Sequence, residues 1–403
     1  MLPVSHEFDM IGQAELMQRM FNGDDLSQTA QGLINTSRTN ASNAEALLDL
    51  STILLLRGDQ EIGLLTQMQA LQLKQLYSIQ DPICTTGRQF RLLVIKTPGN
   101  FMANTPVEFM IRTSDICVDE LYIAPNLPYP LILDYDLVFV AISEAEENRV
   151  ALKMTETLLK QWHLPYINNP DEIPLLARDR ACELMDTIPG IYMPQNILVD
   201  RQQLNDMASL QQQLSEYLIE DKFPIITRPA GSHAGQGLSK LSCYEDIEAY
   251  LKLHDDEQFF IAPFSDYRSP DGLFRKYRIV FISGAPYLCH MAISENWLVH
   301  YLNAGMTLDE DKRFEENRAM TFFDTGLAER QKDAFMKLRD TIDLDYFGID
   351  CAETPDGELL VFELANAMIV HDMDPIEMFP YKQPAMEKVF NAFHEMLRGK
   401  ATL

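Results

Sequence analysis

The sequence is poor in basic residues. Its 403 residues contain 33 lysines and arginines against 60 aspartates and glutamates, which gives a formal net charge of −27. Because proteins that bind nucleic acids or anionic membranes do so largely by neutralising phosphate groups, neither is an expected partner. The acidity is typical of a protein kept dispersed by charge repulsion, with an acidic surface for a basic partner as the alternative.

Clustered cysteines and long apolar runs are also lacking. The first ten residues, MLPVSHEFDM, have neither the basic start nor the apolar stretch of a signal peptide. The longest nearly apolar stretch, residues 47–56, is too short to span a bilayer. The cysteines lie too far apart for a zinc or redox motif, so we expect a cytoplasmic protein with buried thiols. They are Cys84, Cys117, Cys182, Cys243, Cys289 and Cys351.

Two common nucleotide-binding motifs are missing from the whole chain. Neither GxGxxG nor GxxxxGK[ST] occurs. The sequence therefore predicts neither a standard NAD-binding domain nor a P-loop ATPase.

What the chain does contain is a helical region over residues 1–88. Apolar residues recur at helical spacing in residues 43–57 and 60–76, with Gly58 between them, which predicts a helical hairpin. The hairpin resembles one tetratricopeptide-like unit, and a single unit cannot bury its own apolar face. We expect it to pack on the rest of the chain or on a second copy in a homo-oligomer such as a dimer. Recognition of a peptide or carrier is the alternative.

The remaining chain predicts an α/β fold in three parts. Residues 89–172 alternate strands with helices, which is typical of an α/β domain with a parallel sheet. Its expected strands cover residues 91–96, 118–124, 135–142 and 164–167, and a helix is expected from Ser143 to about residue 162. Residues 173–264 and 265–403 contain hairpins instead, which predict two lobes with mostly antiparallel sheets.

A glycine-rich stretch, RPAGSHAGQG at residues 228–237, lies between the expected strands 223–227 and 238–241. In a hairpin, such a loop forms a flexible flap whose bare amides can point at anionic oxygens. Arg228, at the strand end, adds a cation for phosphate. The flap residues that we assign to the site are Gly231, Ser232, His233, Gly235 and Gly237.

Three later segments contain further residues that suit a nucleotide-binding site. The apolar strand 258–264 offers its backbone edge, at Ala262 and Phe264, to an adenine ring. In FRKYRIVFISG, Lys276 and Arg278 share one face of a strand. Finally, a hairpin turned at residues 355–357 brings Asp350 and Glu363 onto neighbouring strands with Asn366 nearby, an oxygen-only set that suits Mg²⁺.

In this order the segments resemble the ATP-grasp superfamily, and within it the glutathione synthetases and ribosomal-protein glutamate ligases. The resemblance covers roughly residue 92 to the C-terminus. It implies ATP and Mg²⁺ as cofactors, a metal site at Asp350, Glu363 and Asn366, and a phosphate-stabilising role for Arg278. Arg180 matches a basic residue that often opens the family's nucleotide-binding region.

Two positions depart from the family's pattern. The family usually carries lysine where this chain has Arg228, and arginine still offers charge and a fork of donors. The usual Glu-x-Asn motif is lengthened here to Glu363-Leu364-Ala365-Asn366. Since one extra residue moves a side chain to the other face of a strand, the assignment of Asn366 depends on where that strand ends.

The resemblance implies a ligase that joins a carboxylate to an amine through an acyl-phosphate, on an amino acid, a peptide or a related small acid. Arg275, Lys276, His300 and His371 are candidate substrate-binding residues, with ion pairing or structural roles as the alternatives. The other functions left open are an ATP-grasp kinase, a peptide-tailoring ligase that grips a leader peptide with its N-terminal helices, and a non-catalytic interaction protein.

Overall fold

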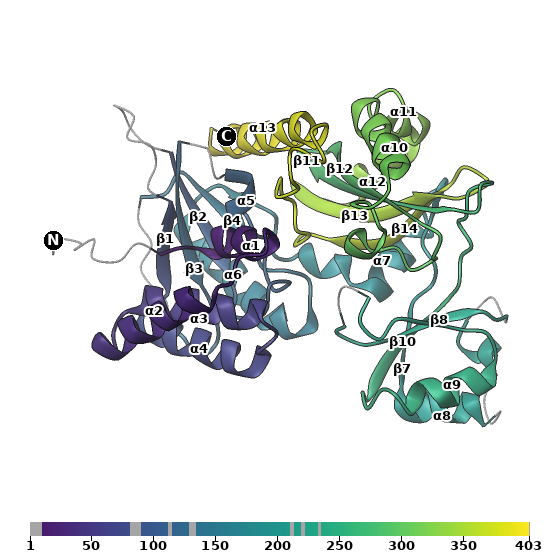
Figure 1. Cartoon of the computed structure of the whole chain (residues 1–403), viewed down its shortest axis with the longest axis horizontal. Coiled ribbons are helices and arrows are strands. Elements are labelled where there is room, and N and C mark those ends of the chain that lie inside the picture. Colours follow the sequence, from purple (N-terminus) through teal and green to yellow (C-terminus); the bar gives the residue numbers. More distant parts are fainter. Residues whose placement is uncertain are drawn as a thin grey trace. The chain divides into compact units, whose positions relative to one another are not determined.

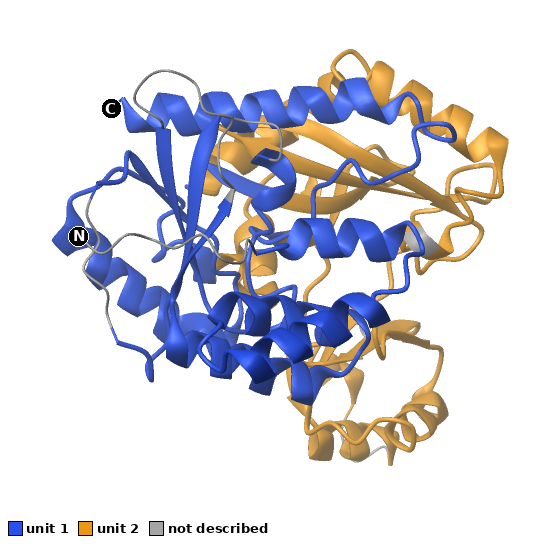
Figure 2. Ribbon diagram, turned by 60° about the vertical axis from the view of Figure 1, so that its left-hand side comes forward, with its two compact units in different colours: residues 1–174, 343–347, 365–403 blue, residues 175–342, 348–364 orange. Residues whose placement is uncertain are grey.

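The structure is a computed structural model that describes residues 10–80, 90–111, 115–128, 134–209, 213–218, 222–232 and 235–402. The chain divides into two compact units (Figure 2). Unit 1 comprises residues 1–174, 343–347 and 365–403, and unit 2 comprises residues 175–342 and 348–364.

Unit 1 begins with four helices (Figure 1): α1 (Gln13–Phe21), α2 (Ser27–Thr39), α3 (Ala44–Leu56) and α4 (Gln60–Leu73). Helices α3 and α4 form the expected hairpin. Asn43 caps α3 by accepting a hydrogen bond from Ala46 N at 2.8 Å. Gly58, with φ +87°, lies in the turn between the two helices.

A parallel sheet follows, as predicted, in the strand order β1-β3-β2-β4-β5. Its members are β1 (Leu76–Gln80), β2 (Phe90–Lys96), β3 (Ile116–Tyr122), β4 (Leu137–Val140) and β5 (Tyr166–Ile167). Strand β1 pairs antiparallel with β3. The sequence analysis missed β1, because it assigned residues 1–88 to helices.

Two helices of unit 1 pack around this sheet. Helix α6 (Arg149–Trp162) begins six residues later than predicted, because the buried Ser143 accepts hydrogen bonds from Asn148 Nδ2 and does not cap a helix. The C-terminal helix α13 (Lys382–Ala401) places Phe393 against Phe139, with ring centroids 5.7 Å apart.

Unit 2 contains two further sheets, both mostly antiparallel. One has the order β7-β10-β8-β9, and the other has the order β12-β11-β13-β14-β6, in which β6 runs parallel to β14. The strands are β6 (Ile191–Tyr192), β7 (Ile197–Asp200), β8 (Ile225–Pro229), β9 (Ser239–Leu241), β10 (Gln258–Pro263), β11 (Phe274–Ile282), β12 (Ala285–Ser294), β13 (Tyr346–Glu353) and β14 (Leu359–Ala365). The predicted class, an α/β chain with N-terminal helices, a parallel sheet and two later antiparallel sheets, is confirmed.

The longer helices of unit 2 are α7 (Arg178–Met185), α8 (Arg201–Ala208), α9 (Tyr244–Leu251), α10 (Glu310–Thr321) and α12 (Lys332–Thr341). Helices α8 and α9 cover the four-stranded sheet, where Leu204 and Ile247 share a buried core with Ile261. Within the described ranges, no helix combines the length and the apolar character needed to cross a membrane.

Candidate functional site

Asp350, on β13, is held by two cations from the neighbouring strand β11. Lys276 Nζ lies 2.8 Å from its Oδ2, and Arg278 donates to Oδ1 at 2.8 Å and to Oδ2 at 3.1 Å. The two cations are two residues apart and share a strand face, as predicted. Burial raises the pKa of Asp350, but Arg278 and Lys276 outweigh it and hold that pKa well below its usual range. The carboxylate is therefore ionised and saturated with donors.

Glu363, on β14, is held by an arginine that the sequence analysis passed over. Arg178, the first residue of α7, donates from Nη2 to Glu363 Oε1 at 2.8 Å. Arg180, which the resemblance selected, is exposed, and two residues along a helix it points away from Arg178. The apolar side of α7 could have indicated Arg178 from the sequence, because Ala181, Cys182 and Met185 define the face that Arg178 adjoins. The nucleotide-binding role of Arg180 stays a prediction.

Arg228, at the end of β8, is the third arginine of this group. Its guanidinium donates to Ser232 Oγ at 3.1 Å and to the Ser232 carbonyl. Burial, and then the positive charge of Arg178, lower the pKa of Arg228 to about 10, while Glu363 opposes the shift. In the described part of the chain, no carboxylate is hydrogen-bonded to Arg228. This half-buried cation is therefore a favourable position for an anion.

The six charges form one cluster, because Glu363 acts electrostatically on both Arg228 and Arg278. Four cations stand against two carboxylates, an excess of two positive charges in a chain whose net charge is −27. A partly desolvated positive cluster of this kind favours a multiply charged anion. Its members are Arg178, Arg228, Lys276, Arg278, Asp350 and Glu363, and we call it the cation cluster.

The glycine loop joins β8 to β9 in the same unit. Gly231, Gly235 and Gly237 have φ values of +76°, +76° and +64°, which side-chain-bearing residues rarely adopt. A Cβ at Gly237 would lie 2.6 Å from Cδ of Pro229. Ser232 Oγ donates to the carbonyl of Pro229 at 2.8 Å, and its partner in the prediction, His233, lies outside the described residues. The loop keeps its backbone bare next to Arg228.

Strand β10 extends beyond the end of its pairing with β7. It pairs with β8 up to Pro263, but its pairing with β7 ends at Ile261. Ala262 thus continues past β7, as a base-recognising edge requires. The amide of Phe264 is already used, because it donates to the Pro224 carbonyl at 3.0 Å. The Phe264 ring instead packs edge-on against Trp297, at 5.7 Å between centroids.

Asn366 belongs to unit 1 and is fully buried, where its Nδ2 donates to the Ile142 carbonyl at 2.8 Å and its Oδ1 accepts from Glu144 N at 3.2 Å. Its amide thus ties the chain after β14 to the loop after β4. The extra residue carries Asn366 just past the end of β14 at Ala365, and both ends of its amide have partners within unit 1. Its role as a metal ligand stays a prediction.

Two of the predicted substrate residues have structural partners instead. Arg275 lies on the opposite face of β11 and forms ion pairs with Asp271 and Glu315, at 2.7 and 2.5 Å, which is the alternative that the sequence left open. His371 belongs to unit 1, where its Nδ1 accepts from Met373 N at 3.1 Å. Both residues thus have partners within the chain, and their roles in substrate binding stay predictions.

His300 lies beside the cation cluster. Burial lowers its pKa, and the nearby charges of Lys276 and Arg278 lower it further. The imidazole is therefore neutral at pH 7, and it keeps its place among the candidate substrate residues with Lys276.

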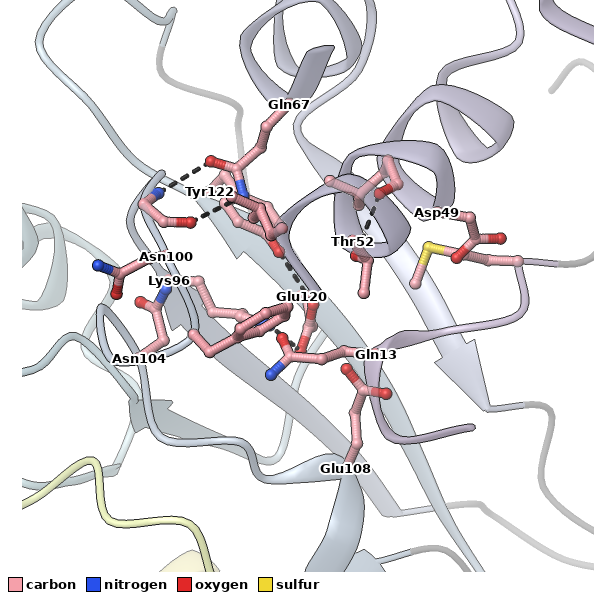
Figure 3. Close-up of a pocket in the computed structure, with 15 residues that line it drawn as sticks. Gln13, Asp49, Thr52, Gln67, Lys96, Asn100, Asn104, Glu108, Glu120 and Tyr122 are labelled. Carbon is pink, nitrogen blue, oxygen red and sulfur yellow. Dashed lines mark hydrogen bonds and ion pairs between the residues drawn. The ribbon is translucent and has the colours of Figure 1, made fainter. Parts of the chain in front are cut away.

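A second polar group lines a cavity of about 20 Å³ in unit 1, room for about one water molecule (Figure 3). Lys96 Nζ donates to Glu120 Oε1 at 2.8 Å, and both side chains are 3% exposed. Asp49, on α3, accepts from Ile11 N and Gly12 N just before α1, and Glu108, on α5 (Glu108–Ile111), accepts from Ala14 N in the first turn of α1. The two carboxylates thus link the start of α1 to α3 and to α5.

Comparison with known proteins finds similarity to solved structures. No protein-family model matches the sequence, and no curated protein matches it either. The chain is similar to the crystal structure of the VanG D-Ala:D-Ser ligase from Enterococcus faecalis, with 13% identity and a TM-score of 0.47, over 78% of this chain and 100% of that chain. It is also similar to a RimK domain ATP-grasp protein from Sphaerobacter thermophilus, with 15% identity and a TM-score of 0.41, over 76% of this chain and 99% of that chain.

Proposed function

We propose that the chain is an ATP-dependent carboxylate–amine ligase of the ATP-grasp type, which forms an amide through an acyl-phosphate and releases ADP and phosphate. The observation that carries this proposal is the excess of two positive charges in the cation cluster, next to a glycine loop with bare amides. A polyphosphate satisfies both features at once.

The nucleotide assignment follows from which cations have few carboxylate partners. Among the described residues, no carboxylate is hydrogen-bonded to Arg228, and Arg178 is hydrogen-bonded to the single carboxylate of Glu363. We assign these two arginines and the loop amides to the phosphates of ATP. The backbone of Ala262, past the end of β7, is assigned to the edge of the base.

The donor set of the cluster fits Mg²⁺ in part. Asp350 and Glu363 supply the hard oxygen ligands that this ion prefers, whereas the amide of Asn366 has its partners within unit 1. We propose that Glu363 and Asp350 hold Mg²⁺ together with the phosphates, and that the bound ion would neutralise the negative charge of the transferring phosphoryl group.

The chemistry then uses the residues of β11. A substrate carboxylate oxygen attacks the γ-phosphorus of ATP, and the bond from that phosphorus to the β-phosphate oxygen breaks to leave ADP. Arg278, fixed by Asp350, stabilises the charge on the transferring group. The amine then attacks the carbonyl carbon, the carbon–oxygen bond to phosphate breaks, and the amine loses a proton. We assign Lys276 and the neighbouring His300 to the substrate carboxylate.

The test measures ADP and phosphate release from Mg²⁺-ATP with pooled amino acids and short peptides, with products weighed for the loss of one water. We compare the wild type with Glu363→Gln. The matched control is Glu353→Gln, at the end of β13, whose side chain pairs with Arg330. ADP matched by a condensed product, lost only in Glu363→Gln, supports the ligase. A phosphorylated, uncondensed product would identify a kinase, and a failure to bind ATP would exclude both.

A further inference from the structure

The ion pair between Arg178 and Glu363 occupies a carboxylate that the proposed function assigns to a metal. Arg178 Nη2 lies 2.8 Å from Glu363 Oε1, and the two side chains are 18% and 32% exposed. The pair is thus neither deeply buried nor fully solvated. Such a pair can open when a competing anion reaches the arginine, because water reaches both partners.

The surroundings of Glu363 oppose a free dication. Arg178 is bonded to it, and Arg228 and Arg278 are both close enough for the charge of Glu363 to act on them. Three guanidinium groups around one carboxylate repel a divalent metal ion. Asp350, the other carboxylate, has both oxygens engaged by Lys276 and Arg278. In the described part of the chain, therefore, neither carboxylate presents a vacant, electronegative metal site.

A bound polyphosphate would make the site favourable to a cation. Its oxygens would compete with Glu363 for Arg178, which would leave Oε1 of Glu363 available and bring negative charge next to it. Arg178 would then pair with phosphate, and Glu363 would be available to the metal.

We propose that Arg178 is a positioning residue that locks Glu363 in the free protein, so that the divalent cation enters only together with the nucleotide phosphates. This inference rests on the proposed function. It predicts that one substitution has effects of opposite sign: removing the guanidinium strengthens the binding of the metal alone and weakens the binding of the nucleotide.

The experiment uses Mn²⁺ as the probe and measures its binding by electron paramagnetic resonance, without nucleotide, on the full chain. Arg178→Met keeps an unbranched aliphatic side chain and removes the guanidinium with its charge. Arg330→Met is the matched control, because it removes a guanidinium from another arginine–glutamate ion pair of unit 2, the one with Glu353. We expect Arg178→Met to bind Mn²⁺ at least about tenfold more tightly than the wild type, since one guanidinium has been removed from beside the ligand oxygen, and Arg330→Met to behave as the wild type.

The double variant Arg178→Met with Glu363→Gln shows whether the gained site uses Glu363. Loss of the gain in the double variant supports the exchange. Equal Mn²⁺ affinity in Arg178→Met and the wild type, or a gain that persists without Glu363, would overturn it. Circular dichroism confirms that the variants are folded. Binding of a non-hydrolysable ATP analogue is measured separately, so that a wild type that binds no nucleotide rejects the proposed function while the Mn²⁺ comparison still decides the lock.

Discussion

Lys276 Nζ lies 2.8 Å from Oδ2 of Asp350, and the same oxygen also accepts a hydrogen bond from Arg278 at 3.1 Å. The side chain of Asp350 is only 4% exposed. One buried carboxylate therefore fixes the position of two cations on β11, and these two cations are the ones that the proposed mechanism uses. The proposed mechanism therefore makes the catalytic arrangement and the stability of unit 2 depend on the same residue.

Replacing this carboxylate tests that dependence. Asp350→Asn leaves two cations facing a neutral amide in a buried site, and breaking a buried ion pair typically costs about 3–5 kcal/mol. We expect a large fall in the urea midpoint together with the loss of ADP formation. The control is Asp271→Asn, which breaks a pair with Arg275 at a position where the carboxylate is 48% exposed, and which should cost under about 1 kcal/mol. Similar midpoints for the two variants would contradict this account.

Arg228 gives a prediction in which stability and binding separate. Its pKa is lowered by burial and then by Arg178, so its positive charge destabilises the folded protein when no ligand is bound. We expect Arg228→Met to leave the melting temperature without ligand unchanged or slightly raised. The affinity for an ATP analogue should fall by about 10–100-fold, the value of one or two hydrogen bonds to a charged group. A thermal-shift titration measures both. Unchanged affinity for the analogue would remove Arg228 from the phosphate site.

The glycine loop offers a matched pair of alanine variants. Gly231 and Gly237 both have positive φ, so either substitution strains the backbone by about 1–2 kcal/mol. Only at Gly237 would the new Cβ also meet Pro229, at 2.6 Å, whereas at Gly231 nothing lies within 4 Å. We expect Gly237→Ala to lose more stability and to raise the KM for ATP more than Gly231→Ala does. The reverse order in urea denaturation would mean that the loop does not pack as described.

The buried carboxyl groups of Asp49 and Glu108 in unit 1 predict a pH dependence of stability. Burial raises the pKa of Asp49 from 3.8 to about 6, and burial and then Glu120 raise that of Glu108 from 4.5 to about 7. At a pH between the ordinary and the raised pKa of each group, the folded chain keeps a proton that the unfolded chain has released. The contribution of these two groups to stability therefore falls as the pH rises through that range. Lys96, close to Glu108, reduces the effect without cancelling it.

Asp49→Asn removes part of that slope, and it keeps an oxygen for only one of Ile11 N and Gly12 N, which bond to different oxygens of the carboxylate. The lost hydrogen bond lowers stability at every pH, whereas the loss of the titrating group acts only as the pH rises. We therefore expect the stability of Asp49→Asn relative to the wild type, read from urea midpoints, to be higher at about pH 8 than at about pH 5. Asp59→Asn, at an exposed position of the same helical hairpin, is the control and should show no such difference. An equal effect of Asp49→Asn at both pH values would contradict the assignment.

The features of the fold that depend on residue periodicity and on turn residues could be predicted from the sequence. The α3–α4 hairpin, the parallel sheet and the shared face of Lys276 and Arg278 follow from spacings of 3.6 and 2 residues, which are local properties. Position within a helix did not suffice to choose between Arg178 and Arg180, because that choice depends on where α7 packs. The partners of Asn366 could not be predicted for a related reason, since residues 142 and 144 are more than two hundred positions away in the chain.

The most direct measurement follows the oxygen atoms of the acid substrate. Amino acids and short peptides with ¹⁸O-labelled carboxylates are incubated with Mg²⁺-ATP and unlabelled water, and the released phosphate is weighed. If a substrate carboxylate attacks the γ-phosphorus and an amine then displaces phosphate, each turnover transfers one ¹⁸O atom to phosphate, and Glu363→Gln abolishes the transfer. ADP and phosphate formed without ¹⁸O in the phosphate would contradict the acyl-phosphate route and with it the proposed ligase.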